Sequence, residues 1–254
     1  MAAQVITVGS NKSGSGKTTL AVHIILSLVK YGYRVCSIDI DPDQHSLSHY
    51  LENRKRYMLR KQISLSSPTA HTVINQHSLS DTIPQDVHCQ HFHDHIYRIC
   101  QEYDFVVIDT QSSNSFLSRF SHTLANMIIT PVNYSLDDIQ GDYWQMIQDR
   151  YKAHYPIHPS PLQWFVLRNR YLSVHTPGIQ SIYKKISRLA TSHDLLWQDG
   201  LQERPLYHEL FLRGLSLLDI HQDNHGIQIS LPYIAARQEL RQCMRSLCLE
   251  PVRA

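Results

Sequence analysis

The chain has 254 residues, a hydrophobic fraction of 42% and a formal net charge of +2. This length and apolar content allow one well-packed α/β domain over residues 1–254, so the composition does not require a second domain. The small net charge excludes a strongly basic nucleic-acid-binding protein, and contact with DNA would need local basic patches. The five cysteines include no Cys-x-x-Cys pair, and no apolar run approaches the length of a membrane span. We therefore expect a cytoplasmic protein.

A loop rich in glycine and serine, residues 12–18, carries the strongest chemical signal. It reads KSGSGKT and lies between an apolar run at residues 5–8 and an apolar stretch at residues 20–26. Such a loop between a strand and a helix turns its N–H groups around phosphate, whereas a surface Gly/Ser turn would lack this context. We therefore expect a nucleotide, with Lys17 at the terminal phosphates and Thr18 bound to Mg²⁺. The expected nucleotide contacts in the loop are Ser13, Gly14, Ser15, Gly16, Lys17, Thr18 and Thr19.

Carboxylates follow two apolar runs that read as buried strands. The first run, residues 34–42, contains Asp39 and Asp41 two residues apart, and the second, residues 104–110, contains Asp109. Because carboxylates at the C-terminal ends of parallel strands meet at one edge of the sheet, they are well placed for Mg²⁺ and water. Each run alone also fits an ordinary buried strand with an exposed terminal Asp. Their order after a phosphate-binding loop favours a nucleotide site.

Two further apolar runs, residues 126–132 and 163–170, complete the predicted sheet. Strands that alternate with helical stretches indicate a doubly wound, mostly parallel sheet with helices on both faces. The polar stretch 64–85 is expected to be a loop with short ordered pieces. The sequence therefore predicts an α/β P-loop nucleotide-binding fold.

The lysine at position 12 narrows the class of loop. The run 12–18 resembles the deviant Walker A pattern of the ParA/MinD superfamily, K-G-G-x-G-K-[S/T], and departs from it only at Ser13. The resemblance implies ATP as the nucleotide and a Lys12 that reaches the nucleotide of a partner subunit. It also implies that Asp39 binds waters of the Mg²⁺ shell, that Asp41 orients the attacking water, and that Asp109 lies near the metal. The asparagine near the end of the last predicted strand, Asn169, is expected to read adenine, with Arg170 beside it, and a plain turn at the strand end is the alternative.

Several segments outside these motifs are similar to the MipZ family of division-site ATPases. They are residues 52–54, 130–135, 166–170, 203–219 and 235–241, and the similarity is weakest between about residues 60 and 100. The resemblance implies an ATP-dependent homodimer that hydrolyses ATP with Mg²⁺. It further implies binding to a ParB-like partition protein and to non-specific DNA, inhibition of FtsZ polymerisation, and a nucleoid-associated or polar location.

Departures from the family pattern leave other functions open. Ser13 replaces a glycine at the expected dimer contact, and Gln111 stands where the family generally has proline. A ParA-type chromosome or plasmid partition ATPase would use the same catalytic residues. A nucleotide-dependent binding protein with little turnover is a second alternative. A redox protein of the nitrogenase iron-protein type would need interface cysteines, and Cys89 and Cys100 precede the strand that ends in Asp109.

Three other features have two interpretations each. His88, His91 and His95 share one face of a predicted helix and could bind zinc, but an apolar stripe beside them favours a solvated helix edge. The C-terminal apolar face of Leu240, Cys243, Met244 and Leu247 resembles a membrane-binding helix of MinD, but packing on the domain is expected. Basic residues form either solvated faces or DNA contacts. The two basic groups are Arg54, Lys55, Arg56, Arg60 and Lys61, and Arg168, Arg170, Lys184, Lys185 and Arg188.

Overall fold

A parallel sheet organises the computed structural model of the chain. The structure describes residues 3–10, 12–41, 43–74, 85–112, 115–133, 149, 161–172, 176–220 and 229–251. Over these residues the sheet has seven strands in the order β3-β2-β4-β1-β5-β6-β7, and every neighbouring pair is parallel. The strands are β1 (Gln4–Val8), β2 (Val35–Asp39), β3 (Ala70–Val73), β4 (Phe105–Asp109), β5 (Met127–Val132), β6 (Gln163–Arg168) and β7 (Leu196–Asp199). The doubly wound α/β fold predicted from the sequence is confirmed.

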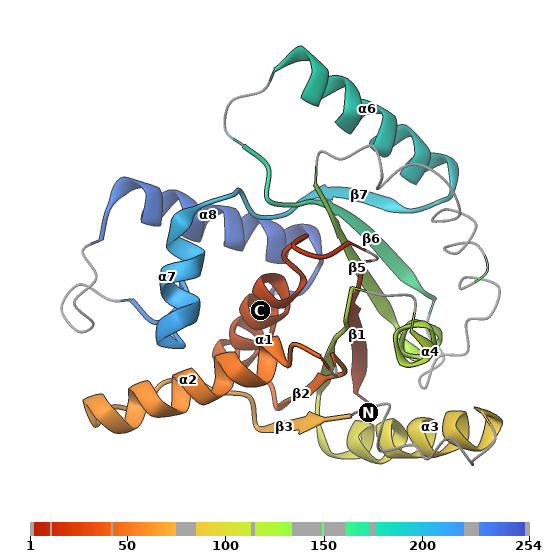
Figure 1. Cartoon of the computed structure of the whole chain (residues 1–254), viewed down its shortest axis with the longest axis vertical. Coiled ribbons are helices and arrows are strands. Elements are labelled where there is room, and N and C mark those ends of the chain that lie inside the picture. Colours follow the sequence, from red (N-terminus) through yellow and green to blue (C-terminus); the bar gives the residue numbers. More distant parts are fainter. Residues whose placement is uncertain are drawn as a thin grey trace.

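Helices cover both faces of this sheet, as parallel strands joined by crossovers require. Figure 1 shows α1, α2, α7 and α8 on one side and α3, α4 and α6 on the other. The helices on the first side are α1 (Lys17–Lys30), α2 (Ser46–Lys61), α7 (Pro205–Arg213) and α8 (Leu231–Ser246). Those on the second side are α3 (Gln85–Glu102), α4 (Phe116–Leu124) and α6 (Pro177–Ser192).

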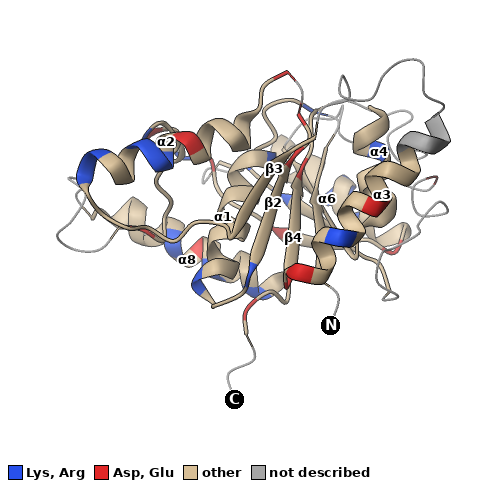
Figure 2. Cartoon of the chain, turned by 90° about the horizontal axis from the view of Figure 1, so that it is seen from below, with Lys and Arg blue, Asp and Glu red and all other residues tan. Residues whose placement is uncertain are grey.

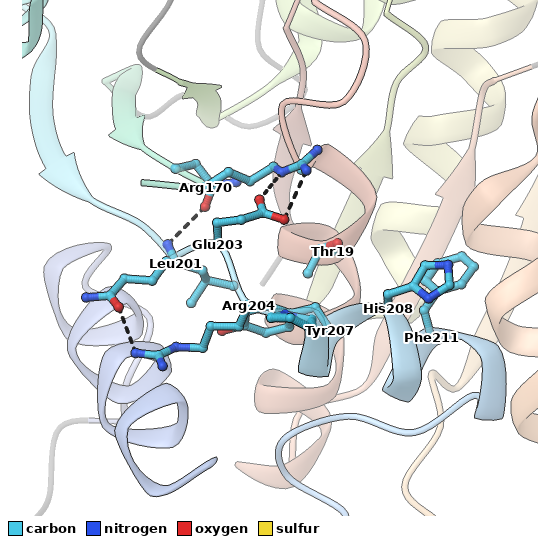
Figure 3. Close-up of a pocket in the computed structure, with 12 residues that line it drawn as sticks. Thr19, Arg170, Leu201, Glu203, Arg204, Tyr207, His208 and Phe211 are labelled. Carbon is cyan, nitrogen blue, oxygen red and sulfur yellow. Dashed lines mark hydrogen bonds and ion pairs between the residues drawn. The ribbon is translucent and has the colours of Figure 1, made fainter. Parts of the chain in front are cut away.

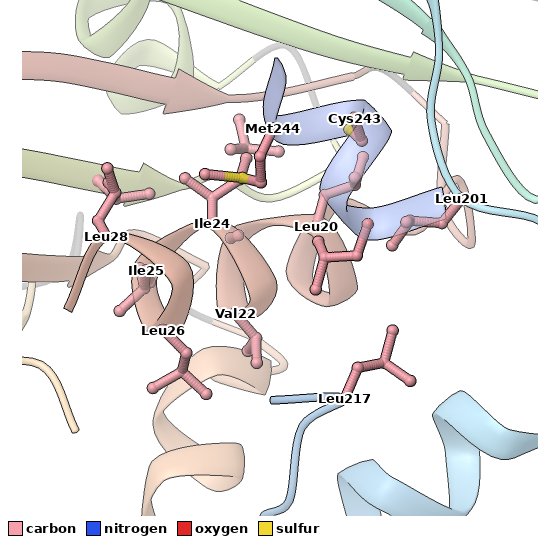
Figure 4. Packing of buried hydrophobic residues seen from close by; sticks show 14 of the residues in the cluster. Leu20, Val22, Ile24, Ile25, Leu26, Leu28, Leu201, Leu217, Cys243 and Met244 are labelled. Atoms are coloured by element: carbon pink, nitrogen blue, oxygen red, sulfur yellow. The ribbon is translucent and has the colours of Figure 1, made fainter. Parts of the chain in front are cut away.

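Helix α1 is the centre of the larger apolar core. Its buried residues, among them Leu20 and Ile24, pack in one cluster with Cys243 and Met244 of α8 (Figure 4). The C-terminal apolar face is therefore used inside the fold, which confirms the expected packing of this helix on the domain. None of the described helices is both long enough and apolar enough to cross a bilayer.

Two strands of the sheet were absent from the sequence-based prediction, which has five. Strands β3 and β7 lie at the two edges, and both are short and only partly buried. Edge strands of this kind lack the long apolar run of a central parallel strand, so their sequences read as polar connections. Strand β3 is one of the ordered pieces expected in the stretch 64–85, and residues 75–84 of that stretch lie outside the described part of the chain.

The topology brings the predicted motifs to one edge of the sheet. In the ladder β1 pairs with β4 and β2 pairs with β4, so Val8 lies beside Asp109, which lies beside Asp39. The loop after β1 enters α1 at the same edge. A ligand bound there would meet the N-terminus of α1 and the ends of three strands, as in other open parallel sheets.

Candidate functional site

The loop between β1 and α1 has the backbone shape of a phosphate cradle. Gly14 and Gly16 have φ values of 72° and 90°, a region that L side chains rarely adopt. A Cβ at Gly16 would also lie 2.4 Å from the side-chain nitrogen of Asn169. Helix α1 follows directly, and no side chain caps its N-terminus. The first N–H groups of α1 are therefore left to a ligand, and the helix dipole favours an anion there.

Lys17 is the first residue of α1, directly after this loop, and is buried, with 6% of its surface exposed. Its ammonium donates to the Lys12 carbonyl at 3.0 Å, the Ser112 hydroxyl at 2.5 Å and the Ser10 hydroxyl at 3.4 Å. All three acceptors are uncharged, so the positive charge is held in place by neutral oxygens. Phosphate oxygens would interact with this ammonium more strongly than neutral oxygens do.

Two carboxylates and a hydroxyl meet beside the loop. Asp39 and Asp109 are paired across β2 and β4. Burial raises the pKa of Asp109 to about 7, and the neighbouring carboxylates Asp39 and Asp41 act in the same direction, while the Thr18 side chain is near enough to Asp109 to lower the pKa of this carboxyl. Burial lowers the pKa of Lys17, while the charges of Asp109 and Asp41 oppose that shift.

These residues fit a divalent cation. Asp109 is 2% exposed, and its Oδ1 atom has no hydrogen-bond partner among the residues that the structure describes. A buried carboxylate oxygen without a partner is costly, and a cation beside Thr18 and Asp109 would remove that cost. Mg²⁺ usually takes one or two protein ligands and completes its shell with phosphates and water. Across the described side chains, no group of three or more His, Cys, Asp and Glu residues is arranged to hold a metal ion.

Asp41 and Lys12 lie at the rim of the site. Asp41 follows β2, and its Oδ1 accepts from the N–H groups of Asp43 at 3.1 Å and Gln44 at 3.0 Å. Lys12 is half-buried and Ser13 is exposed. An exposed position for Ser13 is compatible with a subunit contact, and the reach of Lys12 to a partner's nucleotide stays a prediction.

Asn169 connects the end of β6 to the phosphate loop. It is 1% exposed, its Nδ2 donates to the Ser15 carbonyl at 2.7 Å, and its Oδ1 accepts from the Leu201 N–H at 2.9 Å. Arg170 has a positive φ of 50°, donates to the Gly14 carbonyl and pairs with Glu203. Both residues therefore contact the loop in this structure. Recognition of adenine by Asn169 stays a prediction.

A pocket opens next to the loop (Figure 3). Its volume is about 240 Å³, and it reaches from Gly16 and Thr19 to α7. Tyr207 and Phe211 supply aromatic surface, and Glu203 supplies a carboxylate. Pockets with apolar walls and a few polar groups are typical of sites for small organic ligands. The remaining lining residues are Asn169, Arg170, Leu201, Gln202, Arg204, Pro205 and His208.

The sequence analysis assigned nucleotide contacts to Gly16, Thr19, Asn169 and Arg170 of this pocket, and it assigned no role to the lining residues from Leu201 onward. Most of these unassigned residues, from Glu203 to Phe211, lie in the stretch 203–219, and the similarity of that stretch to the MipZ family was the only signal for them. Ser10 and Ser112 were missed as well, because isolated serines carry no pattern. Their contacts with Lys17 appear only when β1 and β4 are adjacent.

The basic groups are not arranged as the sequence suggested. Arg54 is 1% exposed and forms two hydrogen bonds with Asp219, at 2.7 and 2.8 Å, so its prediction as part of a basic surface group is wrong. Arg168 pairs with Asp199 at 2.8 Å and lies over the ring of Tyr171. The exposed residues of these groups are Lys55, Arg56, Arg60 and Lys61 of α2, Lys184, Lys185 and Arg188 of α6, and Arg170, which pairs with Glu203. Figure 2 shows basic positions along α2 in blue.

The histidine-rich segment forms α3, as predicted. Phe92 and Ile96 are buried in the second apolar core, which supports the interpretation of α3 as a helix that packs on the sheet. The zinc alternative stays untested in part, because the side chain of His88 lies outside the described residues.

Comparison with known proteins agrees with this geometry. A family model described as ATPase MipZ matches residues 4–251. An uncharacterized ATP-binding protein from Methanocaldococcus jannaschii is 28% identical over 128 residues, 46% of this chain and 47% of that protein. An uncharacterized protein from Mycobacterium tuberculosis is 24% identical over 161 residues, 55% of this chain and 49% of that protein. The chain thus spans about half the length of these curated relatives.

Solved structures of similar fold cover nearly the whole chain. An ATP complex of Cyanothece McdA has a TM-score of 0.70 at 16% identity and covers 99% of both chains. The MinC:MinD cell division complex from Aquifex aeolicus has a TM-score of 0.63 at 18% identity and covers 99% of this chain and 98% of that one. A plasmid partition protein from Borrelia burgdorferi bound to AMPPNP has a TM-score of 0.62 at 14% identity and covers 97% and 98%. At these identities the likeness establishes the fold.

Proposed function

Because the chain belongs to the MipZ ATPase family, we propose that it hydrolyses ATP with Mg²⁺ and that its ATP-bound form is a homodimer. The observation that carries this proposal is the position of Asp109. Its unpartnered Oδ1 lies in the same site as Thr18 and the uncapped N-terminus of α1. A metal-bound triphosphate satisfies both features at once, because it brings a cation to the carboxylate and oxygens to the N–H groups.

In the proposed ATP-bound state, the site residues have different tasks. Lys17 leaves its neutral acceptors and binds the terminal phosphates, and Thr18 and Asp109 hold Mg²⁺, which neutralises phosphate charge when bound. Asp41 would orient the attacking water, and Asp39 would bind waters of the Mg²⁺ shell. Lys12 reaches the phosphates of the partner subunit and makes dimerisation depend on ATP.

The base would occupy the pocket beside α7. A purine ring entering from Gly16 would meet the aromatic side chains of Tyr207 and Phe211. Stacking and apolar contact with such rings are worth about 1–3 kcal/mol for a nucleobase. The main-chain and side-chain groups near Asn169 would then read the ring edge.

The match to the MipZ family supports a proposal for the output of the switch. We propose that the dimer inhibits FtsZ polymerisation, binds a ParB-like protein and contacts DNA without sequence preference, at the nucleoid or a cell pole. The exposed basic residues of α6 support the DNA contact, since phosphate binding needs local positive charge rather than net charge.

Light-scattering mass in Mg·ADP and Mg·ATP tests the switch. The native protein, Lys12→Ala and Asp41→Ala are compared, with Lys61→Ala as a control that removes an exposed lysine far from the loop. We expect an ATP-dependent dimer that Lys12→Ala abolishes and Asp41→Ala prolongs, while Lys61→Ala behaves as native. A protein that binds ATP and stays monomeric would contradict the switch and favour a nucleotide-dependent binding protein. In that case Ser13→Gly, which introduces the glycine of the family pattern, is the first variant to make.

A ParA-type partition ATPase is the second candidate function. The similarity of the fold to a plasmid partition protein supports it. FtsZ polymerisation, followed by sedimentation with the ATP-bound dimer, separates the two. Dimer that binds DNA and leaves FtsZ polymers intact would favour partition.

A further inference from the structure

The carboxylate of Asp39 is held by three donors from the protein. Its Oδ1 accepts from the Asp41 N–H at 3.1 Å. Its Oδ2 accepts from both the N–H of Ser48, at 2.9 Å, and the Ser48 hydroxyl, at 2.7 Å. Asp39 is fully buried and ends β2, while Ser48 lies in the first turn of α2. The orientation of this carboxylate is therefore tied to the start of α2.

His71 extends this network to the edge of the sheet. Its Nε2 lies 3.0 Å from the Ser48 hydroxyl, and its Nδ1 lies 2.9 Å from the Ser37 hydroxyl. Ser48 gives its one proton to Asp39, so it must accept a proton from Nε2 of His71. The neutral ring is thus fixed with its proton on Nε2. Nδ1 faces the Ser37 hydroxyl, which also donates to the Ala70 carbonyl at 3.3 Å.

The network lies beside the proposed metal site, because β2 is between β3 and β4 in the sheet. Ser37 and Asp39 are two residues apart on β2, and His71 is the register partner of Ser37 on β3. On the other side of β2, Asp39 is the register partner of Asp109. His71, Ser48 and Asp39 therefore form a chain of hydrogen bonds that runs from the exposed edge strand to the carboxylate beside Asp109.

We propose that His71 and Ser48 are positioning residues that hold the Asp39 carboxylate toward Asp109 and so set the affinity of the nucleotide site for Mg²⁺. This inference rests on the proposed Mg·ATP function. Two carboxylates that share a site repel each other. The three hydrogen bonds that Asp39 accepts hold it in place against this repulsion. Residues that orient metal-site groups from outside typically change metal affinity about 10–100-fold when they are replaced.

The test measures Mg²⁺ affinity rather than turnover. A fluorescent ATP analogue is bound to the full chain without Mg²⁺ and then titrated with Mg²⁺, and the Mg²⁺ concentration at the midpoint is recorded. The disruptive variants are Ser48→Ala and His71→Leu. The conservative variants are Ser48→Thr, which keeps a hydroxyl, and His71→Gln, whose amide can donate to Ser48. His49→Leu, on the exposed side of α2, is the matched control.

The expected pattern is specific to a positioning role. Ser48→Ala and His71→Leu raise the Mg²⁺ midpoint about tenfold, and affinity without Mg²⁺ does not change. The conservative variants and His49→Leu stay within about twofold of native. The double variant is no worse than the more affected single variant, because both residues act through one carboxylate.

Two outcomes would overturn the inference, and they differ in what they leave standing. A native protein with a clear Mg²⁺ midpoint that neither disruptive variant moves would contradict the positioning role alone. A native protein that binds no nucleotide, or binds it without regard to Mg²⁺, would contradict the proposed function as well. Thermal unfolding of each variant checks folding. If Ser48→Ala does not fold, His71→Leu decides, because His71 is exposed on an edge strand.

Discussion

The Nδ2 atom of Asn169 donates to the main-chain carbonyl of Ser15 over 2.7 Å, so the end of β6 holds the phosphate loop from behind. The same amide accepts from the Leu201 N–H through its oxygen. One buried side chain thereby joins the loop, β6 and the segment after β7. This contact predicts a structural contribution from a residue that the sequence analysis assigned to the base.

Asn169→Ala should lower the free energy of unfolding by about 2 kcal/mol without nucleotide, because two buried polar groups lose their partner. Asn169→Asp should cost a similar amount, since it would set an oxygen against the Ser15 carbonyl. Urea denaturation of the nucleotide-free protein measures both. If stability is unchanged and only the preference for ATP over GTP is lost, Asn169 reads the base and does not anchor the loop.

His23 should make the fold sensitive to mild acid. Its ring is buried, with Nδ1 2.8 Å from the Thr19 carbonyl and Nε2 3.3 Å from the Leu217 N–H, an arrangement that fits the neutral ring. Burial lowers the pKa of His23 below 6.5. The folded state thus binds fewer protons than the unfolded state, and the stability from neutral His23 is present above pH 6.5 and lost as pH falls through the folded pKa.

The measurement is urea denaturation of native protein, His23→Gln and His49→Gln between about pH 7.5 and pH 5. Native protein and His49→Gln should lose stability as the pH falls, and His23→Gln should lose less over that range. His49 is exposed and controls for removal of a histidine. Equal slopes for all three proteins would rule out His23 as the source.

Replacing one member of the buried pair of Arg54 and Asp219 should strongly lower the free energy of unfolding. Asp219→Asn should cost about 3–5 kcal/mol, because it leaves the guanidinium of Arg54 buried with no opposite charge. Arg56→Met is the control, since Arg56 pairs with Glu52 on the exposed side of the same helix and such pairs contribute about 0–1 kcal/mol. Chemical denaturation compares the two. A small effect of Asp219→Asn would contradict the burial of this pair.

Two glycines of positive φ should differ sharply in their tolerance of alanine. Gly214 has φ of +66°, and a Cβ there would lie 2.0 Å from the backbone nitrogen of Arg54. Gly32 has φ of +93°, and no described atom lies within 4 Å of its Cβ position. Gly32→Ala should cost about 1 kcal/mol from backbone strain alone. Gly214→Ala should cost roughly 3 kcal/mol more, because α2 and the end of α7 must separate. Thermal unfolding measures the stability of both variants. An equal loss of stability in the two would contradict the close approach of Gly214 to the backbone of Arg54.

The central strands and the phosphate loop could be predicted from the sequence because their signals are local. The apolar run before Asp109 and the spacing of glycine and lysine in residues 12–18 need no knowledge of the rest of the chain. The parallel topology then follows from the alternation of strands and helices. These parts of the prediction are confirmed in the fold, and the individual ligand contacts of the site residues stay predictions.

Contacts between residues that are far apart in the chain could not be predicted from the sequence. Arg54 reads as one of several basic residues on a helix, and only the fold brings Asp219 to it. His71 lies in a polar stretch whose strand forms by pairing with β2, so its contact with Ser48 has no local signal. Burial of a charge and a hydrogen bond across elements are tertiary properties. The periodicity of the sequence carries no signal of either property.

The central position of β1 also determines when the site can exist during synthesis. Strand β1 is synthesised before the other six strands of the described sheet, but its neighbours in the sheet are β4 and β5, and β5 ends at Val132. At about 5–20 residues per second, translation takes roughly ten seconds to supply both partners. During that interval an apolar strand attached to a glycine-rich loop has no place in a sheet. The strand that leads into the candidate nucleotide site is therefore made early, and the site is completed only after β5 has been made.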